Sequence, residues 1–198
     1  NKNTVYVGGV NMWGSTDGAV TFDPIAHWTT FNGPTLHGDI HNIEWQASTG
    51  QFFVVSDGGV YKTSNIIMSN WSVPSWPTVW TKLNDGMQVT SFYRLSSSKN
   101  ISGRLCAGAQ DNATFYYESG GWATIFGGDG MDNYLDPLNN NNVFGASQYG
   151  YFWESNNDGI SSNNPSTNPN SDSAEWVTPI VADYNHPVVL YIGNENVV

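Results

Sequence analysis

The chain has 198 residues and a formal net charge of −11, because 17 Asp and Glu outnumber six Lys and Arg. Nucleic acids and anionic membrane surfaces need a basic binding face, so this composition argues against both as partners. Nine Trp, ten Tyr and nine Phe argue against a disordered chain, and no apolar run is long enough to insert into a membrane.

A strand–turn–strand pattern recurs along the chain. It covers residues 4–15, 52–64, 104–119 and 142–155, and a fifth copy begins at Val188. The second strand of the successive copies carries Trp13, Tyr61, Phe115 and Phe152, with Val198 at the matching place in the fifth copy. These residues lie about 37 to 54 positions apart, a spacing typical of one four-stranded propeller blade per copy.

The sequence therefore predicts an all-β fold: a β-propeller segment of four-stranded antiparallel blades, three complete and two partial. The expected divisions are a partial blade 1–35, blades 36–86, 87–127 and 128–178, and a partial blade 179–198. Strands A to D are expected at 40–46, 51–56, 60–64 and 79–83 in the first complete blade. They are expected at 89–96, 104–109, 113–118 and 122–126 in the second, and at 131–136, 143–147, 151–155 and 175–178 in the third.

The two partial blades lack different strands. The first begins at strand B, and the last has strand A near 180–183 and ends within strand C. Both possess B and C, so they cannot be two halves of one blade. We therefore expect the rest of a larger polypeptide, or another chain, to supply the missing blades and cover the exposed strand edges.

The single cysteine, Cys106, excludes an intramolecular disulfide. It lies between Leu105 and Ala107 in the predicted strand 104–109. We predict a buried structural thiol.

Polar residues collect at one end of the predicted blades. Strand direction alternates, so the D-to-A links and the B-to-C turns share a face of the propeller. The ligand-binding candidates on that face are His37, Asp39, His41, Asp57, Gln110, Asp111, Asn112, Asp129, Asp132 and Tyr149, with Asp85, Gln148, Asn194 and Glu195 beside them. Turns favour Asp, Asn and Gly for conformational reasons, which explains any single residue equally well. As a set, the residues favour a binding surface.

The sequence suggests two metal sites. His37, Asp39 and His41 alternate, and residues two apart on a strand point to one side, so they could hold a divalent metal with Asp57 as a further ligand. The alternative is a hydrogen-bonded network between blades. Asp129, Asp132 and Asp136 supply the oxygen ligands that Ca²⁺ prefers, so calcium is a possible cofactor there.

Paired carboxylates offer a catalytic alternative. Glycoside hydrolysis needs two acids about 5 to 9 Å apart across a sugar, one of them kept protonated. The candidates are Asp39, Asp57, Asp111 and Asp129. Distances between blades cannot be derived from sequence.

The segments HGDIH (37–41), SDGGVYKT (56–63), AQDNATF (109–115) and GGDG (127–130) resemble sortilin-like and BNR (Asp-box) β-propellers of secreted bacterial proteins. That family is often labelled glycosyl-hydrolase-like and is frequent in Bacteroidetes. Its Asp-box, Ser-x-Asp-x-Gly-x-x-Trp, is approximated at 15–18 and 155–159 without the Trp.

The resemblance implies a secreted or cell-surface recognition or scaffold module without catalytic activity, which binds a glycan or protein. The alternative that it leaves open is a glycoside hydrolase, a xyloglucanase-like endo-glucanase that uses two Asp across the channel.

Overall fold

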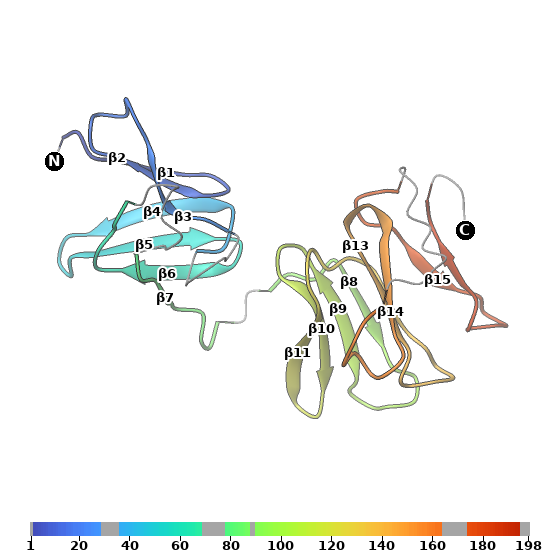
Figure 1. Cartoon of the computed structure of the whole chain (residues 1–198). Helices are drawn as coiled ribbons and strands as arrows, with labels where there is room; N and C mark the ends of the chain where they lie inside the picture. The colour runs from blue at the N-terminus through green and yellow to red at the C-terminus, as the bar shows by residue number, and fades with distance from the viewer. Residues whose placement is uncertain (1, 29–35, 69–77, 88–89, 164–173, 195–198) are drawn as a thin grey trace. The chain divides into compact units, whose positions relative to one another are not determined.

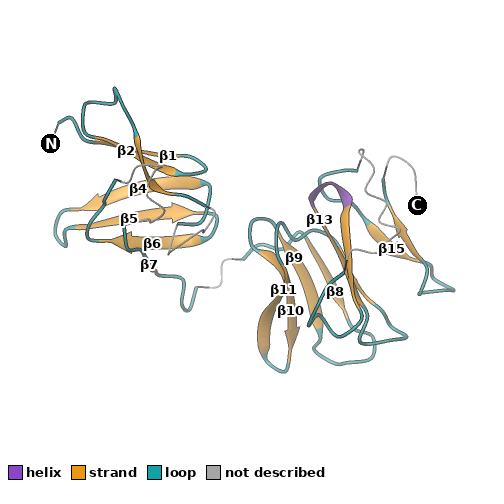
Figure 2. Cartoon of the chain, viewed as in Figure 1, coloured by secondary structure: helices purple, strands orange, loops and turns teal. Residues whose placement is uncertain are grey.

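The computed structural model describes residues 2–28, 36–68, 78–87, 90–163 and 174–194. Antiparallel sheets of two to four strands make up the fold, and one 3-10 turn, η1 (Gln148–Gly150), is the helical element of these residues (Figure 2). None of the described segments forms a helix that could cross a membrane. The chain divides into two compact units, Asn1–Gln88 and Val89–Val198 (Figure 1).

The first unit contains two meander sheets. Its strands are β1 (Val5–Gly8), β2 (Met12–Ser15) and β3 (Asp23–Ala26) in one sheet, and β4 (Ile40–Gln46), β5 (Gln51–Ser56), β6 (Gly59–Thr63) and β7 (Thr81–Lys82) in the other. Neighbouring strands follow each other in the chain and pair antiparallel. Met12, Ile25, Val54, Tyr61 and Trp80 belong to one buried cluster, so the two sheets share a core.

The second unit contains three sheets. They are β8 (Arg94–Ser97), β9 (Leu105–Ala109), β10 (Ala113–Glu118) and β11 (Gly121–Phe126); then β12 (Asn133–Leu135), β13 (Val143–Ser147) and β14 (Tyr151–Ser155); then β15 (Ile180–Ala182) and β16 (Leu190–Ile192). Side chains of a strand alternate between its two faces. Trp153 accordingly joins a core with Cys106 and Tyr116, whereas Phe152 joins a core with Ile180.

Within each unit, meander sheets that follow one another in the chain share a core, which is the arrangement expected of propeller blades, so the predicted all-β fold class is confirmed. The buried position of Cys106 is confirmed as well, since none of its surface is exposed. The hairpins agree with the predicted strands B and C to within one residue.

The strand predicted at 175–178 is wrong. The Thr178 hydroxyl donates to the Glu175 carbonyl 2.9 Å away, and the Trp176 carbonyl accepts a bond from the Tyr149 N–H at 3.4 Å. These bonds fold the segment into a turn instead of a ladder. Strand D, expected at 79–83, is shorter than predicted and covers Thr81–Lys82. Strand A of the next blade, expected at 89–96, begins at Arg94. The predicted strand C after residue 194, with Glu195 and Val198, lies outside the described residues.

Two turns share one hydrogen-bond pattern although their sequences differ. After β2, the Ser15 hydroxyl donates to Asp17 Oδ1 at 2.7 Å and accepts the Ala19 N–H at 2.9 Å. After β14, the Ser155 hydroxyl donates to Asn157 Oδ1 and accepts the Gly159 N–H, both at 2.9 Å. These are the two segments that approximate the Asp-box. The side-chain oxygen of Asn157 accepts the serine hydroxyl in the second turn, as that of Asp17 does in the first.

Glycines bring two backbones together beside the predicted polar face. The Gly130 N–H donates to the Ala109 carbonyl at 3.0 Å, which joins the end of β9 to the segment before β12. A Cβ atom at Gly108 would collide with the carbonyl oxygen of Met131. The close approach therefore requires glycine, and it places Asp129 beside the β9–β10 turn.

Candidate functional site

The ten ligand-binding candidates from the sequence lie at one end of the sheets of their own unit. In the first unit, Ile40 at the start of β4 pairs with Ser56 at the end of β5, so residues before β4 and in the β5–β6 turn are neighbours. We call His37, Asp39, His41 and Asp57 the first rim.

In the second unit, the matching positions are the β9–β10 and β13–β14 turns and the segment before β12. We call the residues there the second rim: Gln110, Asp111, Asn112, Asp129, Asp132 and Tyr149. Each rim is described within its own unit.

The turn that carries Asp57 is clamped by a side chain from beyond β7. The Asn84 side-chain amide donates to the Gly58 carbonyl at 2.5 Å, and its oxygen accepts the Val60 N–H at 2.9 Å. The imidazole of His37 packs against Gly58 so closely that a Cβ atom there would collide with the ring. The backbone under Asp57 is thus fixed on two sides.

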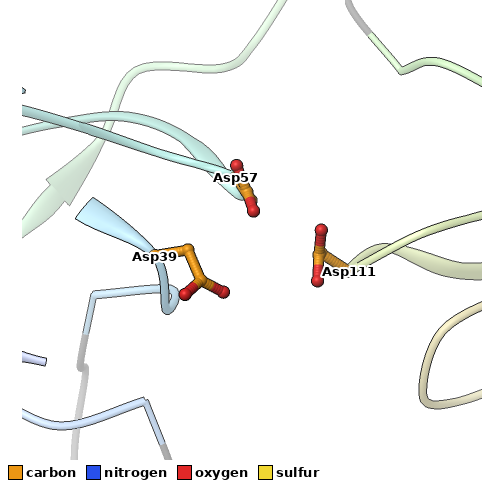
Figure 3. A group of neighbouring side chains, drawn as sticks. All are labelled: Asp39, Asp57 and Asp111. Carbon is orange, nitrogen blue, oxygen red and sulfur yellow. The ribbon is translucent and has the colours of Figure 1, made fainter. Parts of the chain in front are cut away.

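Asp57 forms a pair with His41. The His41 Nε2 atom lies 2.5 Å from Asp57 Oδ1, a hydrogen bond that becomes an ion pair when the imidazole is protonated. The side chain of His41 is 61% exposed and that of Asp57 28% exposed. Figure 3 shows Asp57 on its turn and Asp39 on the segment that precedes β4, with Asp111 of the second unit also drawn.

In the second rim, Asp129 orders the turn that presents Asp111. One Asp129 carboxylate oxygen accepts the backbone N–H of Asp111 at 2.8 Å. Asp111 has a φ of +60°, a conformation that Asp tolerates better than most residues. The Tyr93 hydroxyl donates to the side-chain oxygen of Gln110, and the Asn112 amide donates to the Gln110 carbonyl at 3.2 Å.

The remaining second-rim residues connect neighbouring sheets. The Asp132 carboxylate accepts the Asn133 N–H and the Ile180 N–H, each at 2.9 Å, and so joins the starts of β12 and β15. Tyr149, in η1, has its ring 5.2 Å from that of Trp176 and is 63% exposed. Asp132 therefore holds two strands together, whereas the ring of Tyr149 is accessible to a ligand.

The structure does not reproduce the alternation expected of His37, Asp39 and His41. Asp39 has a φ of +59°, and β4 begins only at Ile40 with a register irregularity between Ile40 and Asn42. A left-handed residue and a bulge both change the direction of the side chains, so period-two spacing no longer applies. Within the described residues, the two histidines do not gather with Asp39 into a set of metal-ligand atoms.

The suggested calcium ligands are likewise separated. Asp132 and Asp136 flank β12 (Asn133–Leu135) at its opposite ends. Asp136 accepts the Leu138 N–H at 2.8 Å and the Asn142 side-chain amide at 3.0 Å. A carboxylate engaged in its own turn at the far end of a strand cannot share an ion with Asp132.

Sequence reasoning missed a buried network at the other end of the second unit. Arg104 is only 6% exposed, and its Nη2 lies 2.8 Å from both carboxylate oxygens of Glu118, while its Nη1 lies 3.2 Å from Asp158. Its guanidinium also donates to the Asn140 carbonyl at 3.0 Å and covers the Tyr116 ring. We call these five residues the Arg104 network.

Burial, together with the hydrogen bond that its hydroxyl donates to Asp158 at 2.6 Å, raises the pKa of Tyr116. The acids lie 14 and 54 residues from Arg104 in the chain. The only sequence signal is an arginine at the edge of an apolar run.

Comparisons with known proteins identify similar structures only. No protein-family profile and no curated protein sequence matches the chain. An ancestral GH74 enzyme shares 14% identity at a TM-score of 0.43 over 96% of this chain and 25% of its own. A GH74 enzyme from Niastella koreensis shares 16% sequence identity at a TM-score of 0.43, and the match covers 98% of this chain and 33% of the enzyme. YCF48 bound to D1 peptide shares 13% identity at a TM-score of 0.40, and the match covers 100% of this chain and 60% of YCF48. The chain thus spans a quarter to a third of the two enzymes, and similarity of this degree assigns neither family nor function.

Proposed function

We propose that the chain is part of a non-catalytic recognition or scaffold propeller that binds a glycan or protein ligand at its acidic rims. The observation that carries the proposal is the clamped turn of the first rim, where Asn84 and His37 fix the backbone beneath Asp57. A carboxylate held in place before the ligand arrives loses less conformational entropy on binding. The sequence resemblance supports a secreted or cell-surface location.

The chemistry of the rims indicates which ligand groups they would contact. Asp57 and Asp111 offer hydrogen-bond acceptors, Asn112 offers both donors and acceptors, and Tyr149 offers an exposed ring. Sugar hydroxyls, or the cationic side chains of a basic peptide, match that set. Anionic ligands do not, because the net charge of −11 would repel them.

A hydrolase is the second candidate, and the rims give it less support. A catalytic acid must hold its proton at neutral pH, which requires an apolar enclosure or a nearby like charge. Asp39 is exposed, Asp57 pairs with His41, and Asp129 accepts a backbone N–H. None of these three carboxylates is buried, so none of them lies in an apolar enclosure.

The test compares binding and hydrolysis in the same variants. Immobilised glycans, including xyloglucan, and a library of Lys- and Arg-containing peptides are probed with the intact chain and with Asp57→Asn and Asp111→Asn. Asp23→Asn serves as the control, because Asp23 is an exposed carboxylate that pairs with Gly14 near the opposite end of its sheet. We expect a rim variant, but not the control, to weaken binding about tenfold or more, the effect of one charged hydrogen bond.

Salt dependence identifies the ligand class. Binding of a cationic peptide falls as ionic strength rises, whereas binding of a neutral glycan does not. Release of reducing ends from xyloglucan that disappears in Asp57→Asn would replace the proposal with the hydrolase. Equal binding by the rim variants and the intact chain, or no binding of any probe, would refute it.

A further inference from the structure

A cavity in the second unit involves none of the rim residues. It has a volume of about 350 Å³ and opens between β11 and β14. The nearly buried rings of Phe126 and Trp153 form its apolar base. Its polar lining comes from Ser147, Tyr151, Ser162 and Asn163.

Local sequence explains why the cavity is present. Gly145 pairs with Trp153 across the β13–β14 ladder, and a Cβ atom at Gly145 would collide with the indole. The indole therefore lies across the bare backbone of β13 and leaves space beside it. Ser147 pairs with Tyr151 in the same ladder, so a hydroxyl and an aromatic ring stand next to each other at the opening.

The far wall is held by backbone bonds. The Asn163 N–H donates to the Glu154 carbonyl at 2.8 Å, and the Glu154 N–H donates to the Asn163 carbonyl at 3.0 Å. Both backbone groups of Asn163 are thereby satisfied, and the residue lines the cavity. Gly159 packs against Ile125 and fixes the preceding turn against β11.

The lining selects a class of ligand. None of the residues that line the cavity carries a charge, so phosphates, carboxylates and ammonium groups would lose their solvation without gaining an ionic partner. Hydroxyl and amide side chains both donate and accept hydrogen bonds, and the Tyr151 ring is 46% exposed. A neutral ring compound with many hydroxyls and one apolar face meets all of these conditions.

We propose that this cavity binds a neutral mono- or disaccharide, with one sugar face on Tyr151 and sugar hydroxyls bonded to Ser147 and Asn163. The volume lies at the small end of the range for ligand pockets, about 300 to 1,000 Å³, which suits a ligand of this size. The proposal is independent of the function proposed for the rims.

Saturation-transfer NMR on the intact chain tests it. The probes are glucose, galactose, N-acetylglucosamine, cellobiose and maltose, with glucuronate as the charged comparison. We expect at least one neutral probe to bind and glucuronate to bind at least about fivefold more weakly. Tyr151→Ala should weaken binding at least about fivefold, the effect of losing one aromatic contact, whereas Tyr151→Phe should keep most of it.

Matched variants separate a local effect from a general one. Tyr184→Ala removes a tyrosine that is 96% exposed and does not line the cavity, so binding should be unchanged. Asn163→Ala provides a second cavity variant, and protection of the buried Cys106 thiol verifies that each variant is folded.

The outcomes distinguish this proposal from that for the rims. Loss of sugar binding in Tyr151→Ala but not in Asp111→Asn or Asp57→Asn supports the cavity. Loss in a rim variant with unchanged binding in Tyr151→Ala assigns the sugar to a rim and overturns the cavity proposal. The cavity proposal also fails if none of the neutral probes binds, whatever the rims bind.

Discussion

Replacing Arg104 with Met is expected to destabilise the second unit by about 3 kcal/mol. Removing one partner of a buried ion pair costs about 3 to 5 kcal/mol, because the other charge is left without compensation. The side chains of Glu118 and Asp158 are 34% and 33% exposed, so water can partly replace the guanidinium, and the lower figure applies. Met retains an unbranched apolar stem, which keeps the loss of packing small.

A second substitution tests whether charge is the cause. In the intact chain, Glu118→Gln breaks the pair with Arg104 and should lower the free energy of unfolding by about 2 kcal/mol. In the Arg104→Met background, the same change removes one of two carboxylates that no longer share a cation. It should then be neutral or stabilising, and a double-mutant cycle measures this reversal.

Cys106 supplies the assay. It is fully buried and belongs to the same core cluster as Tyr116, so its alkylation reports unfolding of the second unit specifically. Pulsed alkylation across a urea series, read by mass spectrometry, gives the unfolding midpoint. Arg94→Met is the matched control, because Arg94 is exposed and its guanidinium donates to the neighbouring Tyr93 carbonyl, and it should change stability by less than about 0.5 kcal/mol.

The result that would refute this reasoning is specific. If Arg104→Met unfolds at the same urea concentration as Arg94→Met, the buried network does not stabilise the unit. If Glu118→Gln costs as much in the Arg104→Met background as in the intact chain, the two residues are not coupled.

Three further predictions concern single residues. Burial raises the pKa of Cys106 from 9.0 to about 12 and also raises the pKa of Tyr116 above 10.0, so the unfolded chain loses these protons at lower pH than the folded chain does. The free energy of unfolding should therefore fall as pH rises above about 9, and Tyr116→Phe should make this fall less steep above a pH of about 10. Asn157 makes the bonds that Asp17 makes in the other turn, so Asp17→Asn should lower the melting temperature less than Asp17→Ala does, measured by circular dichroism. Asn84→Ala removes two hydrogen bonds from the first-rim turn and should destabilise the first unit by about 2 kcal/mol in urea titrations.

The hairpins were predictable from sequence because their turns contain the necessary residues. Asp57-Gly58-Gly59 specifies a tight turn by itself, and the flanking β-branched and aromatic residues specify the strands. The outermost strands depend on a partner instead. Residues 175–178 have a suitable composition, yet their backbone groups bond within a turn and to Tyr149, so no ladder forms.

The rims were predictable only in outline. Alternating strand direction places the acidic turns at the same end of the sheets in each unit, and that requires only strand order. The side-chain geometry around His37, Asp39 and His41 could not be derived, because the spacing of the three residues does not indicate the positive φ of Asp39. The clamp from Asn84 joins residues 24 and 26 positions apart, and no local pattern indicates it.

The meander order of the strands has a consequence for how the chain acquires its structure. Most hydrogen-bonded strands are consecutive and joined by short turns, so little loop entropy is lost when each pair closes. Pairing between neighbouring strands favours early formation of single hairpins, although all-β proteins usually fold slowly. During synthesis, a sheet can form as soon as its own strands have left the ribosome, and the finished sheet then offers its apolar face to the next.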